Sequence, residues 1–253
     1  MKTAFLIGDS KVALFYVENL RSVPDEFIVI QERRKKSRIK SKIARLKKHG
    51  FLKTTDEMLF SLYSKLFLKK VQAKETEKYI TKTYIGPKII VNDINSDKVK
   101  NLLIDFAPNI IMVYGTRILK PAIFELSDYS INVHLGITPD YRGTGNIWAI
   151  YCKDWKNIGA TIHEIDAGVD TGNIIETVRI NVLYSDNIFS IRFRSFVKAT
   201  ERAYNILKAF KNNGVIISKP ISSKGKFRTG FGITNYFLSI LRLRNYQSKI
   251  PRY

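Results

Sequence analysis

The chain has 253 residues, a formal net charge of +21 at pH 7 and a hydrophobic content of 45%. This composition argues for a globular protein and against a disordered one, and the charge predicts binding to anions such as nucleic acid, nucleotide sugars, polyglutamylated folate or acidic lipid. The lone Cys152 excludes an intrachain disulfide, and without a secretory or membrane-spanning pattern we expect a cytoplasmic protein, with attachment to the inner membrane surface as an alternative.

The first thirty residues predict a strand, a helix and a second strand. An apolar run over residues 3–7 is followed by a Gly-Asp-Ser turn at 8–10, whose aspartate or serine caps a helix over 11–20. Residues 26–30 form the second strand. This order favours a parallel α/β sheet. The single glycine of the turn is not a dinucleotide-binding fingerprint, which requires three spaced glycines.

Residues 33–48 are intensely basic and carry Ile39, Ile43 and Leu46 at helical spacing. We expect a helix here, within a basic insertion that spans about 33–72. One interpretation is a solvated helix lying on the sheet. The other is an anion-binding arm for tRNA or for a membrane surface, and the crowding of like charges favours such a partner.

The rest of the chain alternates helices and strands. We expect strands at 88–92, 109–114, 130–135, 159–165, 173–182 and 216–219, and helices at 56–68 (capped by Asp56), 96–106, 146–155 and 185–211, with 69–95 otherwise a connection. The tail from Gly230 on is basic and aromatic, and it docks on the domain, on a dimer mate or in a membrane interface.

Two segments carry the chemistry. Asn132 and His134 share one face of the predicted strand, because side chains alternate at period two, and a Gly/Pro loop follows them. An amide donor beside an imidazole suits holding a developing oxyanion and moving a proton. Asp170, on a second glycine-rich loop, is a candidate for the carboxylate that orients the imidazole.

These residues resemble the active-site signature of the folate-dependent formyltransferases: Asn-x-His, a Pro-x-Tyr-Arg-Gly loop, then Asp-x-Gly-x-Asp-Thr-Gly. The similarity covers about residues 104–174. It implies a Rossmann-like α/β fold, an open and mostly parallel sheet with helices on both faces plus a short C-terminal extension. We therefore expect a catalytic domain at 1–213 and an extension at 214–253.

The resemblance also implies a donor, N10-formyltetrahydrofolate, and roles for individual residues. Asn132, His134 and Asp170 match the catalytic residues. Segments matching the pterin pocket supply the expected cofactor-binding residues, which are Arg117, Ile118, Leu119, Ile165, Asp166, Ala167 and Gly168. The expected substrate-binding residues are Pro139, Tyr141 and Arg142, and Arg142 suits a bidentate contact with phosphate.

Three acceptors compete within this family. The glycinamide ribonucleotide enzymes carry a different phosphate loop from the Gly-Asp-Ser turn here. The methionyl-tRNA enzymes carry a C-terminal barrel for which too few residues follow Asn213, although their basic insertion resembles residues 33–48 in place. We therefore favour a nucleotide-linked amino sugar as the small anionic substrate, with tRNA as an alternative partner and a homodimer as a further expectation.

Each motif also has a simpler explanation. An isolated Asn-x-His is often structural, and Asp166 and Asp170 are typical turn residues. A metal site from His134, His163 and Asp166 is conceivable, but nothing in the sequence places His163 near His134, and we expect no metal. The competing class is a non-catalytic basic module that binds RNA or membrane lipid. The ordered combination of motifs favours the enzyme.

Overall fold

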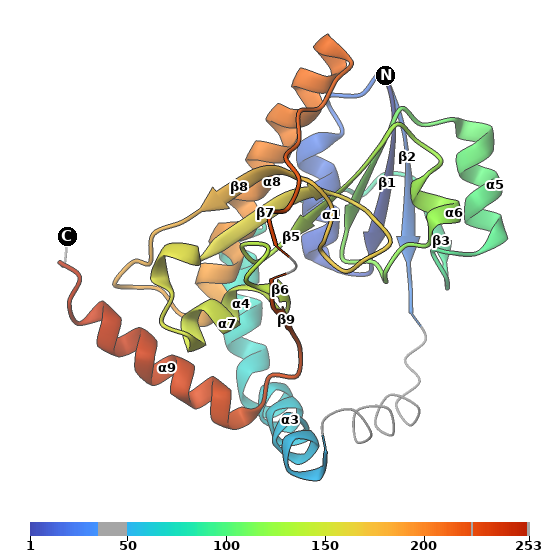
Figure 1. Cartoon of the computed structure of the whole chain (residues 1–253). Helices are drawn as coiled ribbons and strands as arrows, with labels where there is room; N and C mark the ends of the chain where they lie inside the picture. The colour runs from blue at the N-terminus through green and yellow to red at the C-terminus, as the bar shows by residue number, and fades with distance from the viewer. Residues whose placement is uncertain (35–49, 224, 252–253) are drawn as a thin grey trace.

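The computed structural model describes residues 1–34, 50–223 and 225–251. Its main strands are β1 (Lys2–Gly8), β2 (Glu26–Glu32), β3 (Ile89–Val91), β4 (Ile110–Tyr114), β5 (Tyr129–His134), β7 (Gly159–Glu164) and β8 (Ile174–Arg179). Within these described residues they form a seven-stranded sheet in the order β3-β2-β1-β4-β5-β7-β8 (Figure 1). The first five strands run parallel, and β7 and β8 run antiparallel to their neighbours.

Helices cover both faces of this sheet. On one face lie α1 (Lys11–Leu20) and the long α8 (Ile188–Asn213), and on the other lie α5 (Asp97–Phe106) and α6 (Pro121–Phe124) (Figure 1). A hydrophobic core lies on each face of the sheet, and successive residues of β1 point to opposite faces. Phe5 packs toward α1 and α8, whereas Leu6 packs toward α5. The predicted Rossmann-like α/β fold is confirmed.

Capping residues set the limits of the two helices on the first face. Ser10 Oγ accepts the Ala13 N–H at 3.1 Å and begins α1, as the sequence predicted. Asn187 accepts from the N–H groups of Phe189 and Ser190 and begins α8. Gly214, at φ 69°, ends α8 in the left-handed conformation that glycine adopts without strain.

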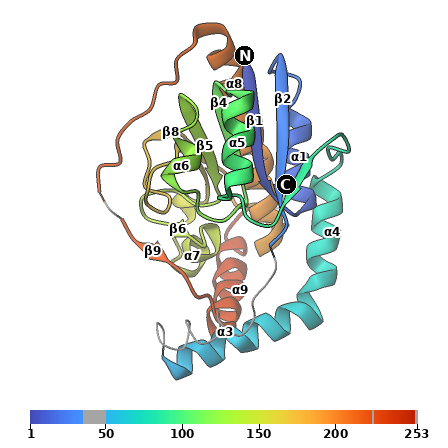
Figure 2. The same cartoon turned by 90° about the vertical axis from the view of Figure 1, so that its right-hand side faces the viewer.

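An arm of helices projects from the sheet before β3. It consists of α3 (Phe51–Tyr63), the π-helical turn η1 (Ser64–Leu68) and α4 (Lys69–Tyr79), and Figure 2 shows α3 beneath the rest of the molecule and α4 rising beside it. The prediction that 69–95 is a connection with only one strand is wrong, since α4 occupies its start. The helix predicted over 33–48 falls on residues 35–49, outside the described part of the chain.

The predicted cap at Asp56 is also wrong, because α3 begins at Phe51. Asp56 instead accepts from the N–H and the hydroxyl of Thr234, at 3.1 and 2.8 Å, at the start of α9 (Ile233–Gln247). The basic, aromatic tail therefore docks on its own domain. Trp155 of η2 (Trp155–Asn157) stacks on Tyr246 of α9 with ring centroids 4.3 Å apart.

Shorter elements complete the fold. The predicted helix 146–155 is α7 (Asn146–Tyr151), and the predicted strand 216–219 is reduced to one bridge between Ile174 and Lys219. A small parallel pair joins β6 (Arg142–Gly143) to β9 (Phe227–Arg228). Among the helices that the structure describes, none is long and apolar enough to cross a membrane.

Candidate active site

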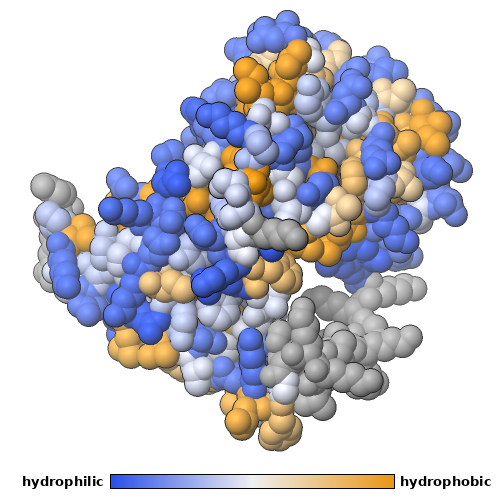
Figure 3. All heavy atoms as spheres, viewed as in Figure 1, coloured by the Kyte–Doolittle hydropathy of each residue, from blue (hydrophilic) through white to orange (hydrophobic). Residues whose placement is uncertain are grey.

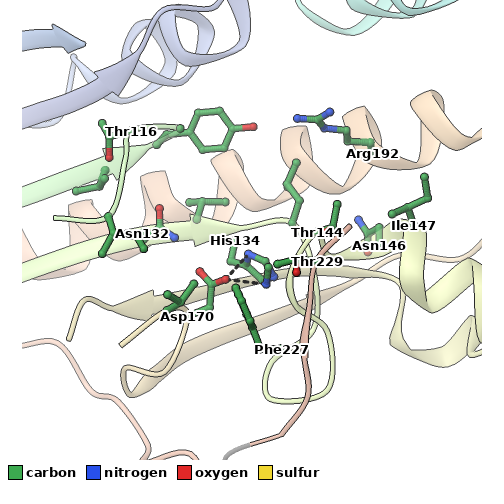
Figure 4. Close-up of a pocket in the computed structure, with 18 of the residues that line it drawn as sticks. Thr116, Asn132, His134, Thr144, Asn146, Ile147, Asp170, Arg192, Phe227 and Thr229 are labelled. Atoms are coloured by element: carbon green, nitrogen blue, oxygen red, sulfur yellow. Dashed lines mark hydrogen bonds and ion pairs between the residues drawn. The ribbon is translucent and has the colours of Figure 1, made fainter. Parts of the chain in front are cut away.

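A cavity of about 740 Å³ opens at the carboxyl ends of β4 and β5. Its walls include Asn132 and His134 of β5, Asp170 of the loop before β8, and Arg192 of α8 (Figure 4). Figure 4 shows the His134 and Asp170 side chains pointing toward each other, with Arg192 on the far side of the cavity. Parallel α/β sheets place ligands at this edge, because the loops that follow the strands converge there.

His134 is held by both ring nitrogens. Nε2–H donates to the Tyr141 carbonyl at 2.8 Å, and Nδ1 lies 3.2 Å from Asp170 Oδ2. Because a carbonyl and a carboxylate only accept, the imidazole satisfies both partners when each nitrogen carries a proton. Burial lowers the pKa of His134, and the Asp170 carboxylate acts against this. Burial has the larger effect, so the pKa of His134 lies below its ordinary value.

Asp170 occupies a left-handed backbone position, at φ 53°, that is uncommon for a residue with a side chain. Its Oδ2 also accepts the Gly143 N–H at 3.0 Å. Burial acts to raise the pKa of Asp170, but the neighbouring His163 and His134 rings and the Gly143 N–H outweigh it, so the pKa is lowered. The carboxylate is thus kept ionised beside the imidazole.

His163 is the residue that sequence reasoning left out of the site. The antiparallel pairing of β5 with β7 sets Asn132 opposite His163, with 3.2 Å between Asn132 Nδ2 and His163 Nε2. His163 Nε2 also lies 3.6 Å from Asp170 Oδ1. The sequence offered no reason to place His163 near His134, because only the pairing of strands far apart in the chain shows it.

The two segments expected to hold the pterin lie along the same cavity. The cavity-lining members are Arg117, Ile118, Leu119, Ile165, Asp166 and Gly168, whereas Ala167 is not among them. Asp166 shapes its loop by accepting from Gly168 N–H at 3.0 Å and Thr171 Oγ1 at 2.7 Å. A Cβ at Gly168 would lie 1.9 Å from Thr171 Oγ1, so only glycine allows this loop to close so tightly. Both segments therefore lie along one cavity, as the predicted pterin pocket requires.

Glu32, at the end of β2, holds the first of these segments in place. Its carboxylate has no exposure to solvent and accepts the Arg117 N–H at 3.0 Å and the Ile94 N–H at 3.1 Å. It also pairs with the Arg117 and Arg34 guanidinium groups. Burial acts to raise the pKa of Glu32, but these donors outweigh it and lower the pKa. The Arg117 side chain is therefore engaged by the protein itself.

The three residues expected to bind substrate do not line the cavity. Tyr141 is buried, its hydroxyl donates to Asp154 Oδ2 at 2.8 Å, and its carbonyl holds His134. Pro139 follows a cis peptide bond and accepts the Lys226 N–H at 3.2 Å. Arg142 lies in β6, beside Phe227. A role for these residues in binding the acceptor stays a prediction.

The C-terminal segment supplies a wall that the sequence did not predict. Pairing of β6 with β9 brings Phe227, Thr229 and Phe231 to the cavity, and Thr144 Oγ1 fastens the pair by donating to the Arg228 carbonyl at 2.9 Å. Phe60 and Ser64 of the helical arm line the cavity as well. A strand of two residues has no hydrophobic period, so the sequence pattern could not reveal this wall.

Arg192 is the cavity-lining cation of α8. It hydrogen-bonds the hydroxyl of Tyr114, and it forms no ion pair with any carboxylate of the described residues. An arginine placed in this way is available to a ligand anion. Within the same described ranges, no group of three or more His, Cys, Asp or Glu side chains is arranged to hold a metal ion.

Comparison with known proteins gives this geometry a context. A methionyl-tRNA formyltransferase of Chlorobium limicola is 28% identical over 130 residues, which are 51% of this chain and 41% of that protein. A GDP-perosamine N-formyltransferase of Brucella melitensis is 30% identical over 115 residues, 45% of this chain and 44% of that protein. The chain thus spans less than half the length of these curated relatives.

Solved structures share the fold at lower sequence identity. A sugar N-formyltransferase from a Shewanella species superposes with a TM-score of 0.60 at 14% identity, covering 96% of this chain and 88% of its own. A 4-N formyltransferase from Francisella tularensis gives 0.59 at 18% identity, covering 96% and 87%. The model of the formyl transferase family matches residues 58–204, more than half of the sequence. The chain belongs to the formyl transferase family.

Proposed function

We propose that this protein transfers a formyl group from N10-formyltetrahydrofolate to the amino group of a nucleotide-linked amino sugar. The observation that carries the proposal is the meeting of Asn132, His134 and Asp170 at one cavity, with the His134–Asp170 contact at 3.2 Å. The backbone segments at Arg117 and at Gly168 lie along the same cavity. An amide, an imidazole and a carboxylate are the groups that acyl transfer to an amine requires.

When bound, the folate supplies the formyl group on its N10 nitrogen. One N–H of Asn132 donates to His163, which leaves its second N–H for the formyl oxygen as negative charge develops there. Such a hydrogen-bond donor lowers the activation barrier by on the order of 3 kcal/mol. His134, two residues further along β5, pairs with Asp170 at the same cavity.

Asp170 completes the proton balance. Asp170 would accept the proton that the amine loses when its nitrogen replaces the folate nitrogen on the formyl carbon. A proton would then return from Asp170 to the leaving nitrogen, because both ring nitrogens of His134 are already held by Tyr141 and Asp170. The lowered pKa of Asp170 keeps its carboxylate ready to accept.

Arg192 supports an acceptor that carries phosphate. Its guanidinium lines the cavity without a carboxylate partner among the described residues, and phosphate is the ligand its forked donors match. The GDP-perosamine enzyme among the relatives acts on a nucleotide sugar by name. A tRNA acceptor is the second candidate, because methionyl-tRNA formyltransferases are similar to this chain at comparable identity.

The test measures turnover of formyl-folate by Asn132→Ala, His134→Ala and Asp170→Ala with a panel of acceptors: nucleotide-linked amino sugars, ribosyl glycinamide phosphate and charged initiator tRNA. We expect each variant to lose about 100-fold or more in kcat with its fold intact by circular dichroism. Asp140→Ala, an exposed carboxylate of the neighbouring loop, is the matched control. Wild-type turnover by all three variants would overturn the assignment.

A further inference from the structure

The helical arm carries a row of large apolar side chains that face solvent. This outer stripe consists of Phe51, Leu52, Met58, Leu59, Leu62 and Leu66. Leu52 is 84% exposed and Leu66 is 65% exposed. At 100° per residue the six positions fall within about 120° of one helix face. Figure 3 shows hydrophobic side chains at the lower end of the molecule, where Figure 1 places α3.

The opposite side of the same helix is already packed. Phe60 contacts Phe231 and Tyr236 with ring centroids 5.8 and 5.3 Å apart, and Phe60 and Ser64 line the catalytic cavity. The outer stripe is therefore a second apolar face that the core does not use. Contiguous exposed apolar surface of this kind marks an interaction site.

The charges of the arm limit what covers the stripe. Lys53, Lys65, Lys69 and Lys70 are exposed, and none forms an ion pair with the carboxylates that the structure describes. Three of the four acids of the arm, Asp56, Glu57 and Glu75, are buried or half-buried, and the exposed Glu77 lies near the end of α4, beyond the stripe. Asp56 binds Thr234 of α9, and Glu75 accepts from Asn187 at 2.8 Å. The face around the stripe is thus cationic.

We propose that the outer stripe docks on the surface of an anionic phospholipid bilayer. Its leucines and phenylalanine enter the boundary between headgroups and acyl chains, and the lysines lie among the phosphates. RNA would use the lysines but gives aliphatic side chains no partner. A second copy of the chain would cover the apolar face, but it would bring together two molecules that each carry +21. An anionic bilayer satisfies both the apolar and the cationic part.

The arrangement places the catalytic cavity next to the lipid surface. The inner side of α3 and η1 faces the cavity through Phe60 and Ser64, and the outer side carries the stripe. One helix, roughly 10 Å across, would separate the two. This inference does not rest on the proposed reaction, and its test is a binding measurement made without substrate.

The experiment is flotation of the full chain with vesicles of phosphatidylglycerol and phosphatidylcholine, against vesicles of phosphatidylcholine alone. We expect binding to the anionic vesicles that weakens with added salt. The triple variant Leu59→Gln, Leu62→Gln, Leu66→Gln should lose on the order of 100-fold in affinity. The matched control, Ile85→Gln with Ile217→Gln, removes two apolar side chains that are 91% and 82% exposed elsewhere and should bind like wild type.

The single variant Leu62→Gln, at a 55% exposed position, keeps the test valid where the triple variant fails to fold. It should weaken vesicle binding several-fold. Wild-type protein that does not bind anionic vesicles overturns the proposal, and so does undiminished binding by the stripe variants. A change from dimer to monomer in light scattering on mutation of the stripe, without vesicle binding by wild type, would assign the face to a second copy instead.

Discussion

Asn132 of β5 and His163 of β7 contact each other across an antiparallel strand pair, with 3.2 Å between Nδ2 and Nε2. His163 Nδ1 donates to the Glu164 carbonyl at 2.7 Å, which leaves Nε2 free to accept from the Asn132 amide. The register of the two strands thus orients the amide. We infer that His163 is a positioning residue for Asn132.

Replacing His163 should lower kcat with little change in KM. In His163→Ala the Asn132 amide loses the partner that fixes its rotation, and one hydrogen bond of this kind corresponds to about a 10-fold loss in rate. His163→Gln supplies an oxygen that accepts from Asn132 and should recover part of the lost rate. Steady-state kinetics on both variants check this. An equal loss in the two, or a loss confined to KM, would refute the positioning role.

Asp170→Asn should reduce the loss of unfolding free energy that the protein shows as the pH is lowered. The pKa of Asp170 is lowered in the folded protein, so its ionised form stabilises the fold above the ordinary carboxyl pKa of about 3.9. That contribution is lost as the pH falls through the lower, folded-state pKa. Urea unfolding between about pH 6 and 3 measures the slope. Asp140→Asn, in the exposed loop, should keep the wild-type slope.

Glu32→Gln should weaken folate binding more than it slows the chemical step. Glu32 accepts the Arg117 N–H and pairs with the Arg117 guanidinium. The glutamine amide of the variant would leave some of these buried donors without an acceptor. We expect a loss of about 1 to 3 kcal/mol in unfolding free energy and a raised KM for formyl-folate. Lys2 pairs with exposed Glu26 at the other end of β2, so Glu26→Gln is the control. An unchanged KM would show that Arg117 keeps its place without Glu32.

Asn187→Ala should destabilise the protein by about 1 kcal/mol, because α8 loses its N-cap. The first turn of α8 carries Ile188 and Phe189 to the cavity wall, so KM should rise too. Asn187→Ser keeps an accepting oxygen and should retain most of the stability. Thermal melts of the two variants compare them directly, and equal melting temperatures would mean that the cap contributes nothing.

The regular sheet was predictable from the sequence because its signals are local. The apolar runs of β1 and β4 are continuous, as buried parallel strands require, and Ser10 lies at the start of α1. The polar helix α4 was missed because it buries no residue and so shows no apolar stripe. Its lysine, glutamate and alanine residues have high helix propensity, and this propensity was the sequence signal for the helix.

The candidate site was only partly readable from the sequence. Asn132 and His134 were linked by the period of one strand, whereas Asp170 was a candidate from its glycine-rich loop that the family resemblance then supported. His163 and the β9 wall needed contacts between distant segments, which no local pattern encodes. The 1–213 and 214–253 division, the homodimer and the inner membrane location stay predictions.

The pairing of Gly143 with Arg228 has a consequence for how the protein is made. During synthesis, Asp170 leaves the ribosome well before the segment that lines the cavity beside it. The wall of the cavity is therefore complete only once β9 has emerged. Fragments that stop after α8 would lack Phe227, Thr229 and Phe231, and with them one wall of the cavity.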